Sequence, residues 1–571
     1  MKNQFVASTL YMIADLLDLK GEMFFKTRAY RIAAQTIEAL EEDIEGIVHQ
    51  GTLESIPGIG EALAKKITEL VETGRLTYLE RLKKDVPTGL IDLLGIPGLG
   101  PRKVAALYKN RGITSIQDLQ IAASKGELRT MKGFGEITER NILRGIQLLE
   151  KTSGRVLLNV AYEDGERYLT YLKKCKKIHK IHIAGSLRRM KETIGDLDIL
   201  VSSKDPETVM ECFVQYPEVS TVLAKGSTKS SVLLNDHLQV DLRVVEEKSY
   251  GAALQYFTGS KDHNVTLRGL AIKKGFKLNE YGLFNKNSEE YIAGKTEEDI
   301  YKKIGMRYIE PELRENRGEF DAAKKNTLPN LVRYQEINGD FHVHSVWSDG
   351  NDSIEAIAAV AQQRGYSFIG ITDHSQSLKI ANGLSEERVQ KKIDEIKKIS
   401  KKFPSLQILC GTECDIKPDG TLDYRTKLLQ QVDFVYIAIH TAFKMPKETM
   451  TKRIIKGMDN EEVNFLAHPT GRLIGKRDAY EVDIEQLIDA AKETDTCLEI
   501  NSFPDRLDLD DVHIKQAKDH HVRFVLGTDS HDTNHLDFMK FGVATARRGW
   551  LEKEDILNTS SVQEIGKILG M

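Results

Sequence analysis

Apolar and polar residues follow different periods in different parts of the chain. Between residues 1 and 150, apolar positions recur every three or four residues, as in Leu10, Ile13, Ala14 and Leu17, and Gly or Pro separates short periodic blocks. This pattern predicts an almost wholly helical region. From about residue 155, β-rich runs alternate with helical sequence, and the candidate strands include residues 181–185, 196–201 and 238–244.

The second half of the chain repeats a strand–helix unit. From residue 337 onward, seven β-rich runs are each followed by helix-like sequence: GDFHVH, SFIGITDH, QILCGTEC, FVYIAIH, VNFLAHP, TCLEIN and RFVLGTDSH. Such repeats predict a parallel sheet or an α/β barrel. The polar, Pro-bounded stretch before them (311–334) is interpreted as a linker.

Composition and charge differ between the two halves of the chain. A chain of 571 residues is long enough for three or more domains. Residues 1–334 carry 51 Lys+Arg and 46 Asp+Glu, whereas residues 335–571 carry 30 and 39 together with ten of the fifteen His. This asymmetry suggests a phosphate-binding half joined to a metal-binding half. Five Cys without a CxxC pair suit a reducing cytoplasm, and no apolar run is long enough to predict a membrane span.

Three segments of the helical region place Gly-x-Gly between an apolar residue and a helix start: SIPGIGEALAKKI (55–67), GIPGLGPRKVAAL (95–107) and MKGFGEITERNI (131–142). Glycines permit a tight turn and let a phosphate approach the N–H groups of a helix N-terminus. One copy alone could be an ordinary helix–helix turn, but three copies resemble the helix-hairpin-helix motif of sequence-independent DNA binding. The resemblance implies DNA contacts at Gly58, Gly60, Gly98, Gly100, Gly133 and Gly135.

A candidate metal site lies on the predicted strands of the middle region. Asp196 and Asp198 alternate along one strand, so both carboxylates face the same side, and Asp241 joins them if its strand lies adjacent. An isolated Asp-Leu-Asp is more often surface polarity than a metal site. Three carboxylates on one face, however, repel one another unless cations such as Mg²⁺ neutralise them, and two Mg²⁺ ions can assist phosphoryl transfer.

The ordered motifs around these carboxylates are GS (185–186), GDLD (195–198), VDLR (240–243) and YFTGS (256–260). Together they resemble family X DNA polymerases, whose palm has the nucleotidyltransferase fold. The resemblance implies that Asp196, Asp198 and Asp241 hold two Mg²⁺ or Mn²⁺ ions and that Asp241 assists deprotonation of the primer 3′-hydroxyl. It assigns nucleotide contacts to Gly185, Ser186, Arg188, Arg189, Gly195, Arg243, Tyr256, Phe257, Gly259, Asn264 and Arg268. The stretch SKDH (260–263) departs from the family's usual residues, which leaves fidelity and sugar discrimination open.

The N-terminal segments RAYR (28–31) and PGIGEALAKK (57–66) resemble the deoxyribose-phosphate lyase domain of the same family. The resemblance implies that Lys66 is a Schiff-base nucleophile, which requires a neutral amine and a lowered pKa. Tyr30 would orient this group. Phe25 and Ala62 stand where the family has polar or basic residues, so Lys66 can also be read as a solvated lysine that contacts DNA phosphate.

Histidines and carboxylates gather at the ends of the predicted strands in the second half. A lone His there would usually be a packed residue, but nine candidates at successive strand ends indicate a metal centre, and imidazole with carboxylate suits Mn²⁺, Zn²⁺ or Fe²⁺. The order of these residues resembles the PHP (polymerase and histidinol phosphatase) family, a distorted barrel with a trinuclear centre that hydrolyses phosphoesters. The implied ligands are His342, His344, Asp349, His374, Glu413, His440, His468, Asp529 and His531. Glu413 would bridge metals, Asp373 would support the centre, and Arg472 and Arg506 are candidates for phosphate binding.

The combined resemblance is to bacterial family X DNA polymerases over nearly the whole chain, a multidomain α+β architecture. We expect a lyase-like helical domain (1–85), helix-hairpin-helix fingers (86–150), a palm (151–247), a thumb (248–315), a linker (316–334) and a distorted (β/α)7 PHP barrel (335–571). The expected function is template-dependent gap filling in base excision repair, with metal-dependent 3′–5′ exonuclease or abasic-site cleavage in the PHP half. The expected enzyme is a cytoplasmic monomer that binds gapped or primed DNA and dNTPs. Alternatives are a PHP half that is a phosphomonoesterase or structural, and a non-catalytic scaffold that binds DNA ends.

Overall fold

A computed structural model describes residues 2–22, 24–38, 40, 44–94, 96, 99–152, 154–235 and 238–570. The chain divides into two compact units. One comprises residues 1–153 with 475–477, and the other comprises the remainder. No helix within the described ranges has both the length and the apolar character needed to cross a membrane.

The first unit is helical, as its periodicity predicts. Its α-helices are α1 (Lys2–Leu19), α2 (Phe24–Glu38), α3 (Ile44–Gln50), α4 (Glu61–Thr73), α5 (Thr77–Asp85), α6 (Thr88–Leu94), α7 (Pro101–Arg111), α8 (Ile116–Ser124) and α9 (Glu136–Thr152), with short 3₁₀ turns η1 (Leu53–Ser55) and η2 (Leu128–Thr130). Leu10, Ile13 and Leu17 of α1 are fully buried in one apolar core. The three-to-four spacing thus identified the inward face of this helix.

The predicted Gly-x-Gly segments lie at helix starts in this unit. Gly60 and Gly100 are the N-caps of α4 and α7. Gly58 and Gly133 have φ of 88° and 87°, a backbone region that favours glycine, and α9 begins directly after Gly135. Gly98 lies outside the described residues.

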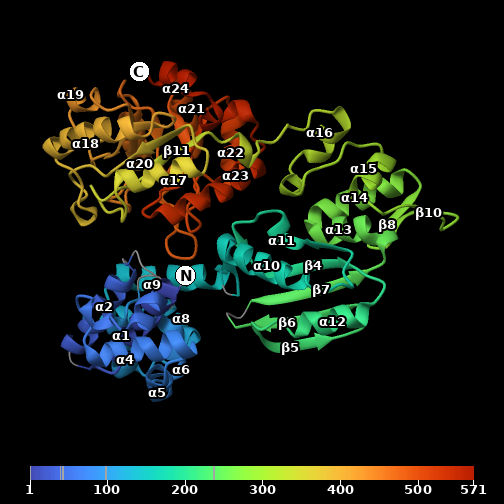
Figure 1. Ribbon diagram of the computed structural model, residues 1–571, viewed down its shortest axis with the longest axis horizontal. Helices are drawn as coiled ribbons and strands as arrows, with labels where there is room; N and C mark the ends of the chain where they lie inside the picture. Colours follow the sequence, from blue (N-terminus) through green and yellow to red (C-terminus); the bar gives the residue numbers. More distant parts are fainter. Residues whose placement is uncertain are drawn as a thin grey trace. The chain divides into compact units, whose positions relative to one another are not determined.

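The second unit begins with a five-stranded palm sheet in the order β2-β4-β7-β6-β5. Figure 1 labels four of these strands, β4, β7, β6 and β5. Its strands are β2 (Lys180–Ile183), β4 (Asp196–Ser202), β5 (Val219–Lys225), β6 (Lys229–Leu234) and β7 (Gln239–Val245); β1 (Val156–Leu157) and β3 (Thr193–Ile194) form a separate pair, and the helices are α10 (Leu158–Leu172), α11 (Gly185–Arg188) and α12 (Pro206–Val214). Only the β4–β7 pairing in this sheet is parallel. Leu197, Ile199 and Val201 pack into the core that α10 and α12 share, which leaves the alternate residues of β4 for the opposite face.

The thumb follows the palm directly. Its elements are η3 (Glu247–Ser249), α13 (Tyr250–Thr258), α14 (Lys261–Lys273), β8 (Phe276–Asn279), β9 (Gly282–Asn285), β10 (Tyr291–Ala293) and α15 (Glu297–Ile304). The stretch interpreted as a linker contains η4 (Pro311–Leu313) and α16 (Glu319–Lys325), and its Phe320 and Leu331 are buried in the thumb core. This connection is therefore packed structure.

The C-terminal part is a parallel seven-stranded barrel with its strands in sequence order. The strands are β11 (Gly339–Val343), β12 (Phe368–Ile371), β13 (Gln407–Asp415), β14 (Phe434–Ala438), β15 (Phe465–Leu466), β16 (Cys497–Asn501) and β17 (Phe524–Gly527). A parallel bridge between Val343 and Ser530 brings the first strand beside the end of the last. All seven predicted strand–helix units are present.

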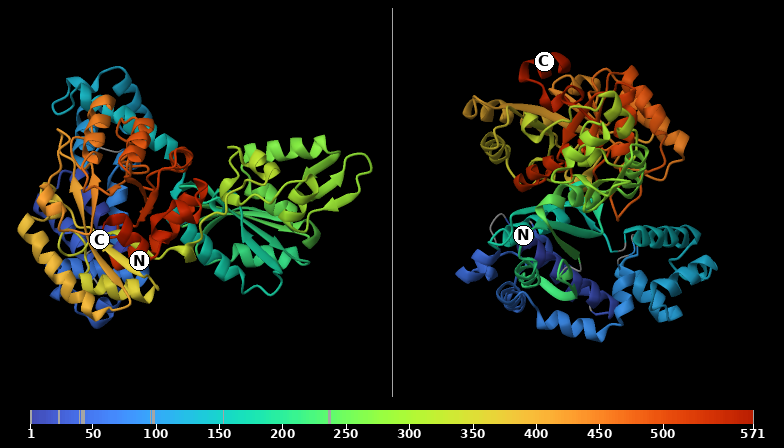
Figure 2. Two further views of the ribbon diagram at one scale, coloured as in Figure 1. Left: turned by 90° about the horizontal axis from the view of Figure 1, so that it is seen from above. Right: turned by 90° about the vertical axis from the view of Figure 1, so that its right-hand side faces the viewer.

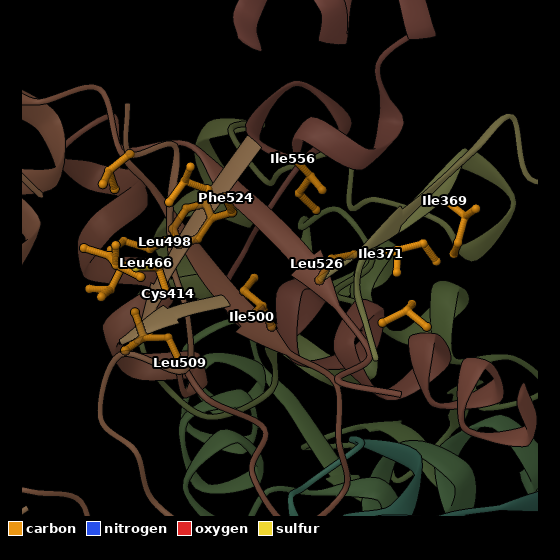
Figure 3. Packing of buried hydrophobic residues seen from close by; sticks show 14 of the residues in the cluster. Ile369, Ile371, Cys414, Leu466, Leu498, Ile500, Leu509, Phe524, Leu526 and Ile556 are labelled. Carbon is orange, nitrogen blue, oxygen red and sulfur yellow. The ribbon is translucent and has the colours of Figure 1, made fainter. Parts of the chain in front are cut away.

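Helices cover the outside of this barrel (Figure 2). They are α17 (Ile354–Gln363), α18 (Glu386–Ile399), α19 (Thr426–Leu429), α20 (Lys447–Met458), α21 (Ile484–Glu493), α22 (Asp511–Asp519), α23 (Met539–Arg548) and α24 (Val562–Leu569), with 3₁₀ turns η5 (Tyr334–Glu336), η6 (Lys379–Ala381), η7 (Ser400–Lys402), η8 (Thr533–Phe538), η9 (Lys553–Asp555) and η10 (Leu557–Thr559). Aliphatic side chains such as Ile371, Leu466 and Leu526 fill the layer between strands and helices (Figure 3). Phe341, Phe434 and other rings form a second buried cluster.

Candidate active sites

The three carboxylates predicted for the palm lie side by side on one face of its sheet. In the parallel register of β4 and β7, Asp198 is directly opposite Asp241. Asp196 lies two residues before Asp198 and shares its face. The strand adjacency that the sequence left conditional is therefore present.

Like charges crowd this acidic face. Burial, and then the neighbouring Asp196 and Asp241 carboxylates, raise the pKa of Asp198 to about 7. Burial acts in the same direction on Asp241, but hydrogen bonds from Gln239 (2.9 Å) and Lys229 (2.9 Å) outweigh it and lower its pKa. Carboxylates held together against their own repulsion are the donor set that fits a divalent cation.

A cavity of about 480 Å³ opens beside the acidic face. It is lined by ten of the residues predicted for this site: Gly185, Ser186, Arg189, Asp196, Asp198, Tyr256, Phe257, Gly259, Asn264 and Arg268. Arg155, Lys191 and Lys261, which the sequence did not single out, also line it. The cavity thus combines acidic residues with several cationic side chains, a composition that suits a nucleoside triphosphate with divalent ions.

Gly185 permits a close approach between the start of α11 and the acidic strand. Its φ is 62°, and a Cβ built on it would lie 2.4 Å from Asp198 Oδ2. A side chain at this position would therefore displace the carboxylate or strain the backbone.

Three predicted nucleotide contacts lie outside the lining of this cavity. Arg188 donates hydrogen bonds to Glu297 (2.6 Å) and Thr258 (2.7 Å), which ties the palm to α15. Arg243 lies over the ring of Phe257, with 4.4 Å to its centroid. Gly195 directly precedes β4, where a Cβ would lie 3.1 Å from Arg155 Nη1. Of the two arginines proposed for the triphosphate, Arg189 is the one that lines the cavity.

The predicted PHP ligands converge at the carboxyl ends of the barrel strands. Three groups of side chains place ligand atoms within 4.8 Å of one another: His344, Asp349, His374 and His531; His342, His344 and Asp529; and His374, Glu413 and His440. The groups share His344 and His374, so they form one continuous centre.

Glu413 lies in the middle of this centre. Its carboxylate oxygens are 2.8–3.7 Å from ring nitrogens of His342, His344, His374, His440 and His468. Among the described residues, the buried atoms without a hydrogen-bond partner include His342 Nε2, His374 Nδ1 and Glu413 Oε2. Buried polar atoms are normally satisfied, so this convergence of unsatisfied donor atoms fits bound metal ions.

Carboxylates outside the ligand set orient two of the imidazoles. His342 Nδ1 donates to Glu499 (2.6 Å), and His440 Nδ1 donates to Asp415 (2.5 Å). Each contact leaves the other ring nitrogen directed at the centre. Neither carboxylate was predicted from the sequence, although a Glu within the apolar run CLEIN and the Glu-x-Asp alternation at 413–415 were available signals.

The remaining candidates around the barrel have defined partners. Asp373 is buried and pairs with the buried Lys392 (3.2 Å). Arg506 Nε lies 3.0 Å from Asp529 Oδ2, beside the candidate metal centre. Arg472 instead donates to Glu192 of the palm (2.7 Å), so it contributes to the contact between palm and barrel.

In the helical unit, Lys66 lies in a partly buried position on α4. Its Nζ donates to the carbonyl oxygen of Ala62 (2.9 Å) and lies 5.1 Å from the ring centroid of Tyr78, on which Tyr30 stacks. Burial and then the charge of Lys26 lower the pKa of Lys66. This direction is the one that an amine nucleophile needs.

An acidic nucleotidyltransferase-type palm and a histidine-rich barrel in one chain define a class of metal-dependent enzyme with two centres. Family models agree with this division: a helix-hairpin-helix domain matches residues 1–76, a SAM-like helix-hairpin-helix tandem matches 90–147, the DNA polymerase beta thumb matches 253–315 and the PHP domain matches 340–503.

Curated relatives extend the similarity to the whole chain. The DNA polymerase/3′-5′ exonuclease PolX of Bacillus subtilis (strain 168) is 38% identical over 571 residues, which cover 100% of this chain and 99% of that protein. DNA polymerase lambda of Rattus norvegicus is 26% identical over 55% of this chain and 56% of its own length. The chain belongs to the family X DNA polymerases that carry a PHP domain.

Proposed function

We propose that this chain is a DNA-directed DNA polymerase that fills short gaps during repair, and that its PHP barrel is a metal-dependent 3′–5′ exonuclease. The observation that carries the polymerase assignment is the register pairing of Asp198 with Asp241, with Asp196 on the same face. The name of the Bacillus subtilis relative, DNA polymerase/3′-5′ exonuclease PolX, describes both activities. Gapped or primed DNA and dNTPs are the proposed substrates of a cytoplasmic monomer.

Each of the predicted palm residues would have a separate role in the polymerase reaction. Asp196, Asp198 and Asp241 would hold two Mg²⁺ or Mn²⁺ ions, which supply charge neutralisation for phosphoryl transfer. Ser186 and Arg189 would bind the triphosphate through hydrogen bonds and charge. Asp241, whose carboxylate lies directly opposite that of Asp198, would also assist deprotonation of the primer 3′-hydroxyl.

A gapped duplex with a 5′-phosphate tests this assignment. We expect primer extension into the gap when dNTPs and either Mg²⁺ or Mn²⁺ are present. The scaffold alternative, in which the chain only binds DNA ends, predicts binding without extension. Failure to extend in both ions would refute the polymerase assignment.

In the barrel, the nine ligands would hold three divalent ions (Mn²⁺, Zn²⁺ or Fe²⁺), which supply an activated water and polarise the phosphate. Glu413 would bridge ions, because five imidazoles surround its carboxylate. Glu499 and Asp415 would keep their histidines in the ligating tautomer. The proposed substrates are 3′-terminal nucleotides or blocked 3′ ends, with abasic-site cleavage as a further activity.

Two substrates distinguish this hydrolase from the small-molecule alternative. We expect a 3′-labelled primer to shorten without dNTPs and histidinol phosphate to remain intact. Hydrolysis of the phosphomonoester with an intact primer would favour a phosphatase. The absence of both reactions would indicate that the barrel is only structural.

The lowered pKa of Lys66 and the position of its amine beside Tyr78 favour a third activity, deoxyribose-phosphate lyase chemistry by Schiff-base formation. Borohydride should trap the chain on DNA with a 5′-deoxyribose phosphate, and Lys66→Arg should abolish trapping. Lys65→Arg is the matched control, because Lys65 is exposed and paired with Glu61 (2.7 Å). Equal trapping by wild type and Lys66→Arg would exclude Lys66 as the nucleophile.

A further inference from the structure

The PHP barrel and the palm share a packed interface within the second unit. Leu507 and Phe541 come from the PHP half, yet both are buried in the apolar core of the palm. Phe541 lies edge-on to Tyr162 of α10, with 5.8 Å between ring centroids. The barrel is therefore built into the folded polymerase half.

Arg548, the last residue of α23, carries a buried charge into this interface. Arg548 is only 3% exposed to solvent. Its Nη1 donates to the carbonyl oxygen of Arg189 (2.7 Å) and to Glu315 Oε1 (3.1 Å), and its Nη2 pairs with Asp511. A buried arginine with this many directed contacts holds its partners in a fixed arrangement.

Glu315 connects Arg548 to the nucleotide cavity. The same Oε1 accepts a hydrogen bond from Arg189 Nε (3.1 Å), and Arg189 Nη1 donates to the carbonyl oxygen of Thr258. The backbone of Arg189 is held by Arg548 and its guanidinium is held by Glu315. Arg189 in turn lines the cavity beside the acidic triad.

We propose that Arg548 is a positioning residue for the polymerase reaction: the PHP half holds Arg189 in the geometry that receives the triphosphate of the incoming nucleotide. The inference rests on the proposed polymerase function. On this proposal, residues from both the polymerase half and the PHP half determine the geometry of the nucleotide pocket.

The shared ion pairs of Glu315 explain why Arg548 would affect triphosphate binding by Arg189. Glu315 divides its negative charge between Arg189 and Arg548. Without Arg548, the buried carboxylate would bind Arg189 more strongly and compete with the triphosphate for it, since an unpaired buried charge is costly. The carbonyl contact that fixes the Arg189 backbone would also be lost.

Steady-state filling of a one-nucleotide gap by the full chain tests this proposal. Because a charge-assisted hydrogen bond contributes on the order of 1.4 kcal/mol or more, Arg548→Met should raise the KM for dNTP about tenfold. We expect kcat, binding of gapped DNA and 3′ degradation to stay near wild type. Adding Glu315→Gln to Arg548→Met should lower the KM again, because the competing charge is then gone.

Arg547→Met is the matched control. Arg547 is the neighbouring residue of α23 and also crosses to the polymerase half, but its partners are Glu312 (2.7 Å) and the carbonyl oxygen of Val332 (3.0 Å), away from the nucleotide cavity. Its loss should leave the KM for dNTP unchanged. If Arg548→Met does not fold, Arg548→Lys keeps the charge without the two-pronged geometry and should give an intermediate KM.

An unchanged KM in a folded Arg548 variant would overturn the proposal, as would an equal rise in Arg547→Met. A further rise in KM on adding Glu315→Gln would refute the competition mechanism. A wild-type chain that fails to extend the primer would instead refute the proposed polymerase function.

Discussion

Asp198 faces Asp241 directly across the parallel β4–β7 pair, and burial together with the neighbouring carboxylates raises the pKa of Asp198 to about 7. Asp198→Asn removes a proposed metal ligand from this pair. We expect nucleotide addition to fall by about three orders of magnitude, because a catalytic metal supplies several kcal/mol of transition-state stabilisation. Primer extension measures the loss, and binding of gapped DNA should persist. Extension at the wild-type rate would contradict the metal assignment.

The same substitution should stabilise the palm when no Mg²⁺ is added. Removing a carboxylate that is both buried and crowded by two others relieves a desolvation cost and a repulsion that together are worth on the order of 1 kcal/mol, the free energy of about one pKa unit. Thermal unfolding should therefore show a higher Tm for Asp198→Asn without Mg²⁺, and a smaller rise in Tm on adding Mg²⁺ than wild type shows. A lower Tm would mean that burial and repulsion of the Asp198 charge do not dominate the stability of this face.

Gly185→Ala should inactivate the polymerase without touching the barrel. The new Cβ would lie 2.4 Å from Asp198 Oδ2, at a backbone φ of 62°. We expect a loss of nucleotide addition of at least about a hundredfold, since misplacement of a catalytic group by about 1 Å has an effect of that size. Exonuclease activity of the same preparation reports on folding.

Gly269→Ala is the matched glycine control. Gly269 lies in α14, and a Cβ there would meet nothing within 4 Å. Alanine is the better helix former, so this variant should be as active as wild type and slightly more stable. Equal inactivation by both substitutions would disprove the close-approach argument at Gly185.

Glu499→Gln should weaken metal binding in the barrel. Glu499 accepts a hydrogen bond from His342 Nδ1 (2.6 Å) and another from the His468 backbone N–H (2.6 Å). Loss of such a supporting carboxylate typically reduces metal affinity or activity about 10- to 100-fold. Metal content by mass spectrometry and 3′ degradation should both fall, while gap filling stays intact. Wild-type metal content would show that Glu499 is only structural.

The sequence predicted the elements better than their pairing. Alternating apolar residues identified the strands at 196–201 and 238–244, which the structure places at Asp196–Ser202 and Gln239–Val245. The register that sets Asp198 against Asp241 depends on contacts between segments about 40 residues apart, and periodicity does not encode it. The stretch 311–334 looked like a linker because it is charged. Its Arg314 is nevertheless fully buried against Glu297 (2.6 Å), a partner that local composition cannot reveal.

For the candidate sites too, the sequence predicted some of the residues, and others became apparent only from the fold. The nine barrel residues grouped from strand ends do come together: eight lie in the three overlapping groups, and His468 Nε2 lies 2.9 Å from Glu413 Oε1. Parallel strands present their carboxyl ends on one side, which explains this convergence. Glu499 and Asp415 contact the predicted ligands His342 and His440 from outside the ligand set, and neither belongs to a motif that could be recognised from spacing. Arg188 and Arg189 are adjacent in sequence, and only the fold separates the one that pairs with Glu297 from the one that lines the cavity.

The thumb should lose stability in mild acid because of His263. Its Nδ1 donates to Glu319 (2.8 Å) and its Nε2 accepts from the Tyr301 hydroxyl (2.8 Å), an arrangement that suits neutral imidazole. Burial lowers the pKa of His263 to about 4. Between pH of about 6.5 and 4 the unfolded chain therefore binds a proton that the folded chain does not, so stability falls as pH falls through this window, by up to about 3 kcal/mol.

His263→Gln tests this effect by thermal unfolding at pH 7.5, 6 and 5. The variant should be less stable than wild type at pH 7.5, because a buried hydrogen bond is lost, and its Tm should fall less steeply with acid. His513→Gln is the opposite-sign control: a hydrogen bond with Asp510 (2.8 Å) raises the pKa of His513, so its contribution to stability grows as pH falls. Removing it should steepen the acid loss. Parallel pH profiles for wild type and His263→Gln would show that His263 does not govern the acid sensitivity, because only a group that titrates differently in the folded and unfolded chain can change that slope.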